Sequence, residues 1–395
     1  MSPVPVVARR RPSLTPVLRT RLRTSAALSA RSGEPDRAAV AELRASGLLA
    51  VAVSEAYGGA GGRAADVNRM VEEVAVVNPS LAIIAFQHCS VAARIGEWGS
   101  AAQKAQLLPR LADGTWLAAS AWSEGGGRPG SGGPRSTAVR EETGGWVLHG
   151  AKAFTTGACL ADVYLVQVRD ARPAVEPAPG GGPRPTFFVV PARTEGLVAE
   201  LGLDLAGMRG SATGTVSLTD CRVRDANRLG AVGAGQEIVA GAHRSGAGLG
   251  AVAVGIAQAA LDEVTGYAHR HGLMGRQSFR YRLAELTTRL EAARAMVERA
   301  GAGTAPRPDL ATLRSKLFAS TAAEDICLEA GRLMGSAGYA SESAVAGLLA
   351  DARGVALMGP SNELCHRLLA VSLLGRDHAV AEEPDEAPEA TVFRI

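Results

Sequence analysis

The chain lacks the features that mark membrane and secreted proteins. No run among its 395 residues approaches the roughly 18 uninterrupted apolar residues of a membrane-spanning helix. The N-terminal stretch Met1–Arg31 is rich in Arg, Pro and Ser but has no apolar signal core. The five cysteines are scattered, none forms a CxxC pair, and their odd number argues against a disulfide framework. We therefore expect a cytoplasmic protein with free thiols, no membrane partner and no metal site.

Neither sign of charge dominates. The chain has 42 basic and 39 acidic residues and a net charge of +3, which gives no reason to expect a nucleic-acid partner. Apolar residues make up 47% of the sequence, so the chain is globular rather than disordered. Its length suggests about two or three domains with ample core.

Short β-strand patterns, separated by glycine-containing turns, occupy the middle of the chain between two helical parts. These patterns predict strands at Ala138–Arg140, Trp146–Leu148, Val163–Val168, Phe187–Val190 and Gly214–Leu218. Apolar residues at helical spacing predict helices at Ala38–Leu49, Ala64–Val77, Leu81–Trp98, Ser100–Leu111, Gly246–His269, Phe279–Gly301, Leu310–Met334, Ser343–Val355 and Glu363–Leu374.

The predicted fold class is α+β with several domains. We expect, in order, a mobile N-terminal arm with a helix from about Thr15 (1–34), a helical domain (35–116), a middle β-domain (117–228), a C-terminal helical bundle (229–376) and a flexible acidic tail (377–395). In the stretch Ala119–Val166, small, hydroxylated and glycine residues lie where a flat ligand could rest against exposed backbone amides.

Several segments, taken together and in this order, resemble the acyl-CoA dehydrogenase family. Gly47–Gly59 is similar to its "GLL…PEEYGG" segment, and Trp98–Gly114 to its "GteeQK…LP" segment. Gly207-Met-Arg-Gly-Ser211 is similar to "GmRgs", and Asp351-Ala-Arg353 to "RDA". The resemblance implies an N-terminal helical domain, a middle antiparallel β-domain, a C-terminal four-helix bundle and a homodimer or homotetramer.

The resemblance also implies FAD as the cofactor, with FMN possible. The strand Ala121–Glu124, with Trp122, would lie along the isoalloxazine, and Ser123 would bond to its pyrimidine edge. Phe154 stands where the family has a stacking Trp, and Thr156, preceded by Thr155, where a threonine approaches flavin N5. Further candidate cofactor contacts are Arg276, Arg332 and Ser361. They lie in segments that stand in the place of the family's "R-x-x-FG", "Q-x-x-GG" and "YEGT" elements but depart from their patterns.

The sequence departs from the family where dehydrogenation needs a carboxylate base. The family's "YEGT" element aligns with Met358-Gly-Pro-Ser361, so Gly359 stands in the base position. The alternative position, near the start of a long helix, falls at about Ser245. Substitute bases are His243, beside that position, and Glu237.

Three functions stay open. The favoured one is oxidation of an acyl thioester, carried on CoA or on an acyl or peptidyl carrier protein, in a biosynthetic pathway with an electron-transfer partner. The second is a two-component monooxygenase or N-hydroxylase, which takes reduced flavin from a reductase and needs no carboxylate base; His88 would then be a proton donor near the flavin. The third is a non-catalytic binding partner with a flavoprotein fold.

Overall fold

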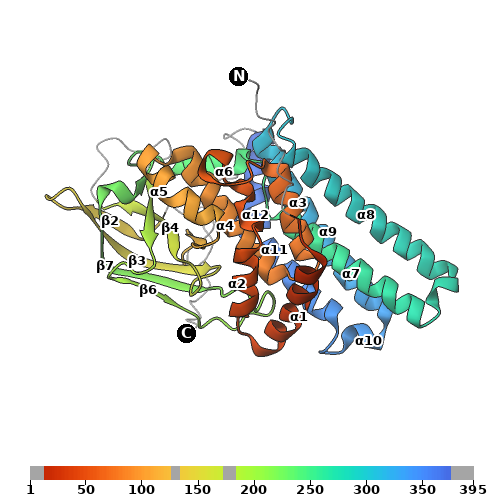
Figure 1. The fold of residues 1–395 in the computed structure, drawn as a ribbon. Coiled ribbons are helices and arrows are strands. Elements are labelled where there is room, and N and C mark those ends of the chain that lie inside the picture. The colour runs from red at the N-terminus through yellow and green to blue at the C-terminus, as the bar shows by residue number, and fades with distance from the viewer. Residues whose placement is uncertain (1–12, 126–133, 172–183, 375–395) are drawn as a thin grey trace, which may run out of the picture.

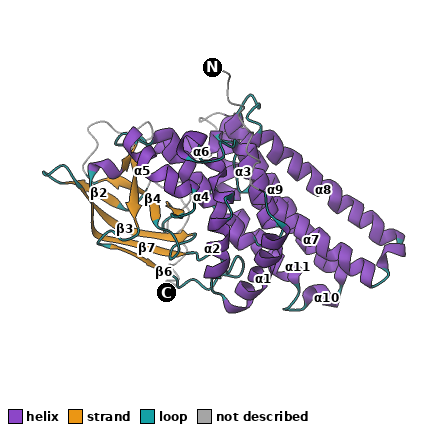
Figure 2. Cartoon of the chain, in the orientation of Figure 1, coloured by secondary structure: helices purple, strands orange, loops and turns teal. Residues whose placement is uncertain are grey.

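The structure is a computed structural model that describes residues 13–125, 134–171 and 184–374. The predicted acidic tail, most of the glycine-rich run that follows Glu124 and the Pro/Gly-rich loop before Pro185 lie outside these residues. Strands gather at one end of the molecule, and the long C-terminal helices extend from the other end (Figure 1). The colouring by secondary structure in Figure 2 shows the same division between the strands and the long helices.

The N-terminal part is helical. It consists of α1 (Pro16–Ser32), α2 (Arg37–Ala45), the 3₁₀ turns η1 (Leu48–Ala52) and η2 (Glu55–Tyr57), α3 (Ala64–Ala75), α4 (Pro79–Trp98) and α5 (Ala101–Ala112). The predicted helices in this part are confirmed, although the one expected at Ala38–Leu49 divides into α2 and η1.

The mobile arm expected before residue 35 is a packed helix over much of its length. Thr15 caps α1 by accepting a hydrogen bond from the Leu18 amide at 3.2 Å, which confirms the predicted helix start. Leu14, Leu18 and Leu22 are buried in the main helical core. Leu18 and Leu22 are four residues apart and lie on one face of α1, while Leu14 precedes the helix. Burial of these three side chains stabilises a segment whose composition suggested mobility.

The middle part is an eight-stranded mixed sheet in the order β6-β7-β3-β2-β4-β5-β8, with β1 paired to β4. Its strands are β1 (Ala118–Ala121), β2 (Thr137–Arg140), β3 (Trp146–Thr155), β4 (Val163–Asp170), β5 (Pro185–Pro191), β6 (Leu197–Glu200), β7 (Gly214–Val223) and β8 (Arg228–Leu229). The prediction of an antiparallel sheet is wrong at two pairings, because β1 and β2 both run parallel to β4.

Both faces of the sheet are buried, and successive residues of a strand enter different cores. Tyr164 and Val166 of β4 belong to the core formed by the strands themselves. Val163 and Leu165 belong to the core beneath α4 and α5. This alternation follows from the two-residue period of a strand, and it fixes the register of β4 against its neighbours.

The C-terminal part consists of α6 (Gly235–Arg244), α7 (Gly250–Arg270), the turn η4 (Leu273–Gly275), α8 (Gln277–Gly301), α9 (Pro308–Met334), α10 (Ser336–Tyr339), α11 (Ala344–Leu357) and α12 (Asn362–Leu374). Helices α7, α8, α9 and α11 form the expected bundle, and α3 packs against α7. A Cβ at Gly255 would lie 2.5 Å from the Ala75 Cβ, so only glycine allows α7 to approach α3 this closely. None of the helices in the described ranges is long and apolar enough to cross a membrane.

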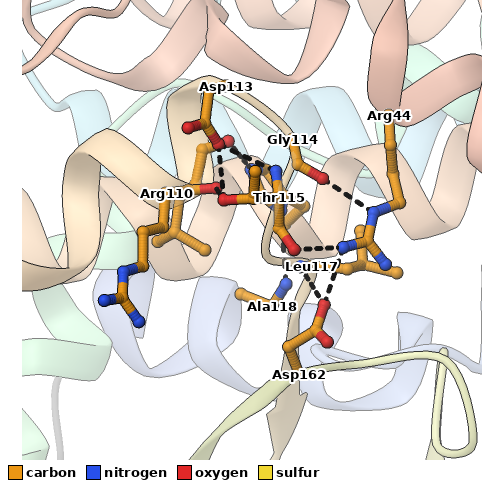
Figure 3. A network of polar contacts seen from close by, with 10 residues as sticks. Arg44, Arg110, Asp113, Gly114, Thr115, Leu117, Ala118 and Asp162 are labelled. Atoms are coloured by element: carbon orange, nitrogen blue, oxygen red, sulfur yellow. Dashed lines mark hydrogen bonds and ion pairs between the residues drawn. The ribbon is translucent and has the colours of Figure 1, made fainter.

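A polar network around Arg44 fastens the N-terminal helices to the sheet (Figure 3). The Arg44 guanidinium donates to the carbonyl oxygens of Gly114, at 2.7 Å, and Thr115, and pairs with the Asp162 carboxylate at 2.9 Å. Asp162 also accepts from the Leu117 amide at 2.8 Å. One side chain of α2 therefore ties the turn after α5 to the entry of β4.

Replacement of Arg44 by Met should destabilise this junction. The variant leaves two carbonyl groups without this donor and leaves the Asp162 carboxylate with the Leu117 amide alone, and we expect a loss of about 2 kcal/mol of unfolding free energy. Thermal denaturation should show a Tm several degrees lower. Arg37→Met, an exposed change on the same helix, should leave the Tm nearly unchanged, and equal Tm values for both variants would contradict the assignment.

Candidate active site

A cavity of about 1430 Å³ lies where the sheet meets the helices of the N- and C-terminal parts. The sheet side includes Trp122, Ser123, Phe154 and Thr156. The opposite side is built from α4, α6, α9 and α11 and includes His243 and Ser245. The structure thus brings together six residues that the sequence suggested for one site. Thr155 does not line the cavity; it lies between two cavity residues, buried, with a hydroxyl that finds no partner among the described residues.

The sheet wall is held by a buried ion pair. The Lys152 ammonium lies 2.5 Å from a carboxylate oxygen of Glu124, and the Lys152 side chain is wholly buried. Ser136 donates from both its amide, at 3.0 Å, and its hydroxyl, at 2.7 Å, to the same oxygen. The Ala153 amide donates to the Ser123 carbonyl at 3.0 Å. These bonds fix the segment after β1 beside β3.

Burial and pairing act on these two charges in different ways. Burial alone would raise the pKa of Glu124, but the hydrogen bonds from Lys152 and Ser136 outweigh it and lower that pKa to about 2. Burial lowers the pKa of Lys152 against the opposing effect of Glu124. The Glu124 carboxylate is therefore ionised at neutral pH, and its role is structural rather than that of a proton acceptor.

Phe154 has an unusual backbone conformation. Its φ is 53°, in the left-handed region that aromatic residues seldom adopt, and the register between β3 and β7 shifts between Lys152 and Thr155. Such an irregularity redirects side chains at the edge of a site. Phe154 is 60% exposed and lines the cavity. The strained backbone therefore places its aromatic ring where a ligand can contact it.

Two polar groups on the same wall can serve a ligand. The Trp122 indole N–H is buried without a hydrogen-bond partner among the described residues, while its ring packs on Phe187 at a centroid distance of 5.0 Å. Thr213 donates to the Thr156 hydroxyl at 3.4 Å, which leaves Thr156 to donate towards the cavity. A flat ligand with acceptor atoms along its edge fits this wall, because a buried donor without a partner is costly.

Three family models cover the chain from residue 11 to 374. They describe the N-terminal domain (11–115), the middle domain (119–221) and the C-terminal domain (238–374) of acyl-CoA dehydrogenases. The chain belongs to the acyl-CoA dehydrogenase family. It is 31% identical over 342 residues to an acyl-CoA dehydrogenase of Bacillus subtilis, covering 83% of this chain and 87% of that protein. The mouse mitochondrial short-chain specific enzyme is 31% identical over 340 residues, covering 83% of this chain and 80% of that protein.

Solved structures of other proteins share the fold. Butyryl-CoA dehydrogenase from Megasphaera elsdenii superposes with a TM-score of 0.81 at 26% identity, over 92% of this chain and 99% of that chain. Dibenzothiophene monooxygenase TdsC from Paenibacillus gives a TM-score of 0.77 at 21% identity, over 90% and 95% of the chains. KijD3, in complex with FMN and a sugar nucleotide, gives 0.81 at 22% identity, over 95% of each chain. The expected helical, β-sheet and helical domains of the acyl-CoA dehydrogenase fold are therefore confirmed, and the chain is an oxidoreductase of that type.

His243 is the imidazole that faces the cavity of this acyl-CoA dehydrogenase-like protein. It lies in the last turn of α6 and is half-buried. Burial lowers the pKa of His243, and the nearby charges of Arg244 and Arg94 act in the same direction against Asp309. The ring is therefore neutral at pH 7 and can accept a proton. Glu237, the other substitute base, is exposed and does not line the cavity.

Neither family position for the base carries a carboxylate in this structure. Gly359 lines the cavity, and Ser361 beside it accepts a hydrogen bond from the Leu364 amide at 3.2 Å, as a cap of α12. Ser245 donates its hydroxyl to the Ala242 carbonyl at 2.8 Å, so this side chain closes the end of α6. Among the described residues that line the cavity, Glu97 is the one carboxylate.

His88 does not fit the role of a proton donor that the sequence suggested. It is fully buried outside the cavity lining, with Nε2 3.1 Å from the Leu111 carbonyl and Nδ1 accepting from the Ala118 amide at 3.2 Å. Burial lowers the pKa of His88 to about 4. It is a neutral core histidine whose ring joins α4 to α5 and β1.

Arg276 and Arg332 lie apart from the cavity. Arg276 is exposed at the start of α8, and Arg332 is exposed near the end of α9, where it pairs with Glu329. The family resemblance assigns the elements that contain them to cofactor contacts. Two cavity residues that the sequence reasoning missed are Arg94 and Lys316; the signal for Arg94 was a lone arginine within the apolar stretch of α4.

Replacement of Glu124 by Gln should destabilise the sheet wall and change its response to acid. The variant leaves the buried Lys152 ammonium without a carboxylate, which should cost about 3 kcal/mol at pH 7. Because the pKa of Glu124 is lowered from 4.5 to about 2, the wild type keeps this stabilisation above pH 4.5 and loses it as the pH falls towards 2.

Denaturant unfolding between pH 7 and pH 2 measures both effects. The difference in unfolding free energy between wild type and Glu124→Gln should become smaller over the acidic part of that range. Glu141→Gln, which breaks an exposed pair with Arg222, should change the unfolding free energy by less than about 0.5 kcal/mol. A constant difference between wild type and Glu124→Gln at all pH values would contradict the pairing.

Proposed function

We propose that this protein is a flavin-dependent dehydrogenase of acyl thioesters carried on CoA or a carrier protein. The observation that supports this most directly is the shared cavity, which joins a flat sheet wall to a neutral imidazole on α6. Relatives that are 31% identical to this chain include acyl-CoA dehydrogenases from a bacterium and a mammal, which supports the same substrate class.

The residues of the sheet wall fit a flavin. Ser123 and Thr156 offer donors, Trp122 has an unpaired N–H, and Phe154 offers an aromatic face. FAD is the cofactor that the family membership favours, and FMN appears in TdsC and KijD3. When bound, the flavin would accept a hydride equivalent from the β-carbon of the acyl group.

In this proposal, His243 removes the proton from the α-carbon. Its neutral imidazole accepts that proton on a ring nitrogen, and the partly buried setting keeps water from competing for it. Gly359 leaves open the space where most family members carry the base, and that space can admit a branched or polar acyl group. Glu97 is a weaker candidate, because Arg94 pairs with its carboxylate at 2.6 Å.

The protein would also act with partners. A separate electron carrier would reoxidise the flavin, and Arg276 and Arg332 would reach the cofactor of a neighbouring subunit in a dimer or tetramer. A role in a biosynthetic pathway agrees with the substituted base, because the altered site need not serve the common fatty acyl chains.

A second candidate function is a two-component monooxygenase that receives reduced flavin from a reductase. The observation that favours it is the absence of a carboxylate at Gly359 and Ser245, since oxygenation needs no base at the α-carbon. The fold likeness to TdsC and KijD3 is compatible with this function but does not select it.

Replacement of His243 by Ala should slow flavin reduction by on the order of 10²-fold, because the α-proton loses its acceptor. Anaerobic stopped-flow mixing of the flavin-loaded protein with a reactive acyl thioester measures this rate. The wild-type rate should rise with pH through an apparent pKa below 6.5, because burial lowers the pKa of His243. His149→Ala, an exposed change at the far side of β3, is the control; an unaltered rate in His243→Ala would remove His243 as the base.

A further inference from the structure

Arg94 is a buried arginine near the C-terminal end of an apolar helix. It lies on α4, its residue exposure is 2%, and its side chain lines the cavity. Burial lowers the pKa of Arg94, yet a guanidinium stays charged at any ordinary pH. A buried charge is costly unless it is paired and hydrogen-bonded, so this position demands an explanation.

The partners of Arg94 within the described chain leave it incompletely satisfied. One terminal nitrogen lies 2.6 Å from a carboxylate oxygen of Glu97, whose side chain is 47% exposed. The Nε–H is buried and has no hydrogen-bond partner among the described residues. A guanidinium presents five N–H donors in a planar fork, so pairing with one carboxylate oxygen leaves donors of Arg94 for a second acceptor in the cavity that it lines.

The cavity around Arg94 carries an excess of positive charge. Its lining contains one carboxylate, that of Glu97, and the cationic side chains Arg63, Arg94, Lys104, Lys316 and Arg353. Lys316 is already bonded to the Ala356 carbonyl at 3.0 Å and to Asn362 at 2.7 Å. Arg63 and Arg353 are exposed to solvent, and Lys104 is half-buried. Arg94 is therefore the buried cation of this lining that has an unused donor.

The neighbouring face of α4 is polar where an apolar acyl chain would prefer hydrocarbon. Gln87 and Ser90 line the cavity on the same side of the helix as Arg94, one to two turns earlier. Glu97 follows Arg94 by three residues on this face. A purely aliphatic ligand would leave these groups unpaired, whereas an acidic group would satisfy the guanidinium.

We propose that Arg94 binds a carboxylate at the distal end of the substrate's acyl group, so that the protein acts on acidic acyl thioesters. This inference rests on the proposed function, since it names the acyl class for the same cavity. A phosphate of CoA or of a carrier arm shares the anion chemistry. However, Arg94 is almost wholly buried, and a compact carboxylate carried on the acyl group can follow the thioester into the cavity.

The test measures how tightly pairs of N-acetylcysteamine thioesters bind to the flavin-loaded protein at equilibrium. The two members of a pair have equal chain length. One member of each pair ends in a methyl group and the other in a carboxylate, and neither carries a phosphate. The wild type should bind the carboxylate member about 10- to 100-fold more tightly. Arg94→Met should abolish this preference, and Arg94→Lys, which keeps the charge but loses the fork, should reduce it.

Two further variants control for folding and for general charge effects. Glu97→Gln removes the competing carboxylate from Arg94 and should increase the preference for the acidic thioester. Arg289→Met removes an exposed arginine that pairs with Asp325 on the distant face of the bundle and should leave the preference as in wild type. If Arg94→Met does not fold, Arg94→Lys and Glu97→Gln still test the proposal in opposite directions.

Equal affinity of the wild type for both members of a pair would overturn the proposal, as would a preference that persists in Arg94→Met. If Arg94→Met instead weakens CoA thioesters relative to N-acetylcysteamine thioesters of either kind, the anion is a CoA phosphate and the acyl assignment is wrong. These outcomes are read from binding. They are therefore distinguishable from a failure of the proposed dehydrogenation, which would show as an absence of flavin reduction by every thioester.

Discussion

The buried ion pair between Glu124 and Lys152 is the interaction on which the site depends. It joins the segment that leaves β1 to the middle of β3, and both Ser123 and Phe154 stand within two residues of it. The amide and the hydroxyl of Ser136 donate hydrogen bonds to the Glu124 carboxylate of this pair. The two charges are therefore compensated within the wall. A wall built in this way can present donors and an aromatic ring at fixed positions before a ligand arrives, which is what electrostatic preorganisation requires.

The wall is useful only because the helical parts meet it in a fixed position. Arg44 and Asp162 tie α2 and α5 to the start of β4, and Gly255 lets α7 approach α3 closely. Helices α4 and α6 then close the cavity opposite the sheet with Arg94 and His243. The site is thus assembled from segments far apart in sequence, and its chemistry comes from side chains that no single motif contains.

The sequence predicted most of the elements, since long helices and strands have strong periodicity, and it placed Trp122, Ser123, Phe154, Thr156 and His243 in one site. The sequence-based predictions were wrong where contacts between distant segments determine the structure. Composition suggested a mobile arm, but Leu18 and Leu22 on one face of α1, with Leu14 just before it, are buried in the helical core. The parallel pairing of β1 with β4 has no local signal, and His88 is recognised as a core residue only once both ring nitrogens meet backbone partners. Arg94 could be recognised as a candidate ligand-binding residue only from the structure, which shows that its side chain is buried and that its Nε–H has no partner among the described residues.

The most direct test of the central claim is an anaerobic absorbance titration of the flavin-loaded protein with acyl thioesters of CoA and of a carrier protein, both neutral and acidic. The proposal predicts that at least one thioester bleaches the oxidised flavin band, which would establish direct removal of hydride despite the missing glutamate. If no thioester bleaches a protein that retains its flavin, dehydrogenation is contradicted. The reaction of the reduced protein with oxygen would then become the chemistry to pursue.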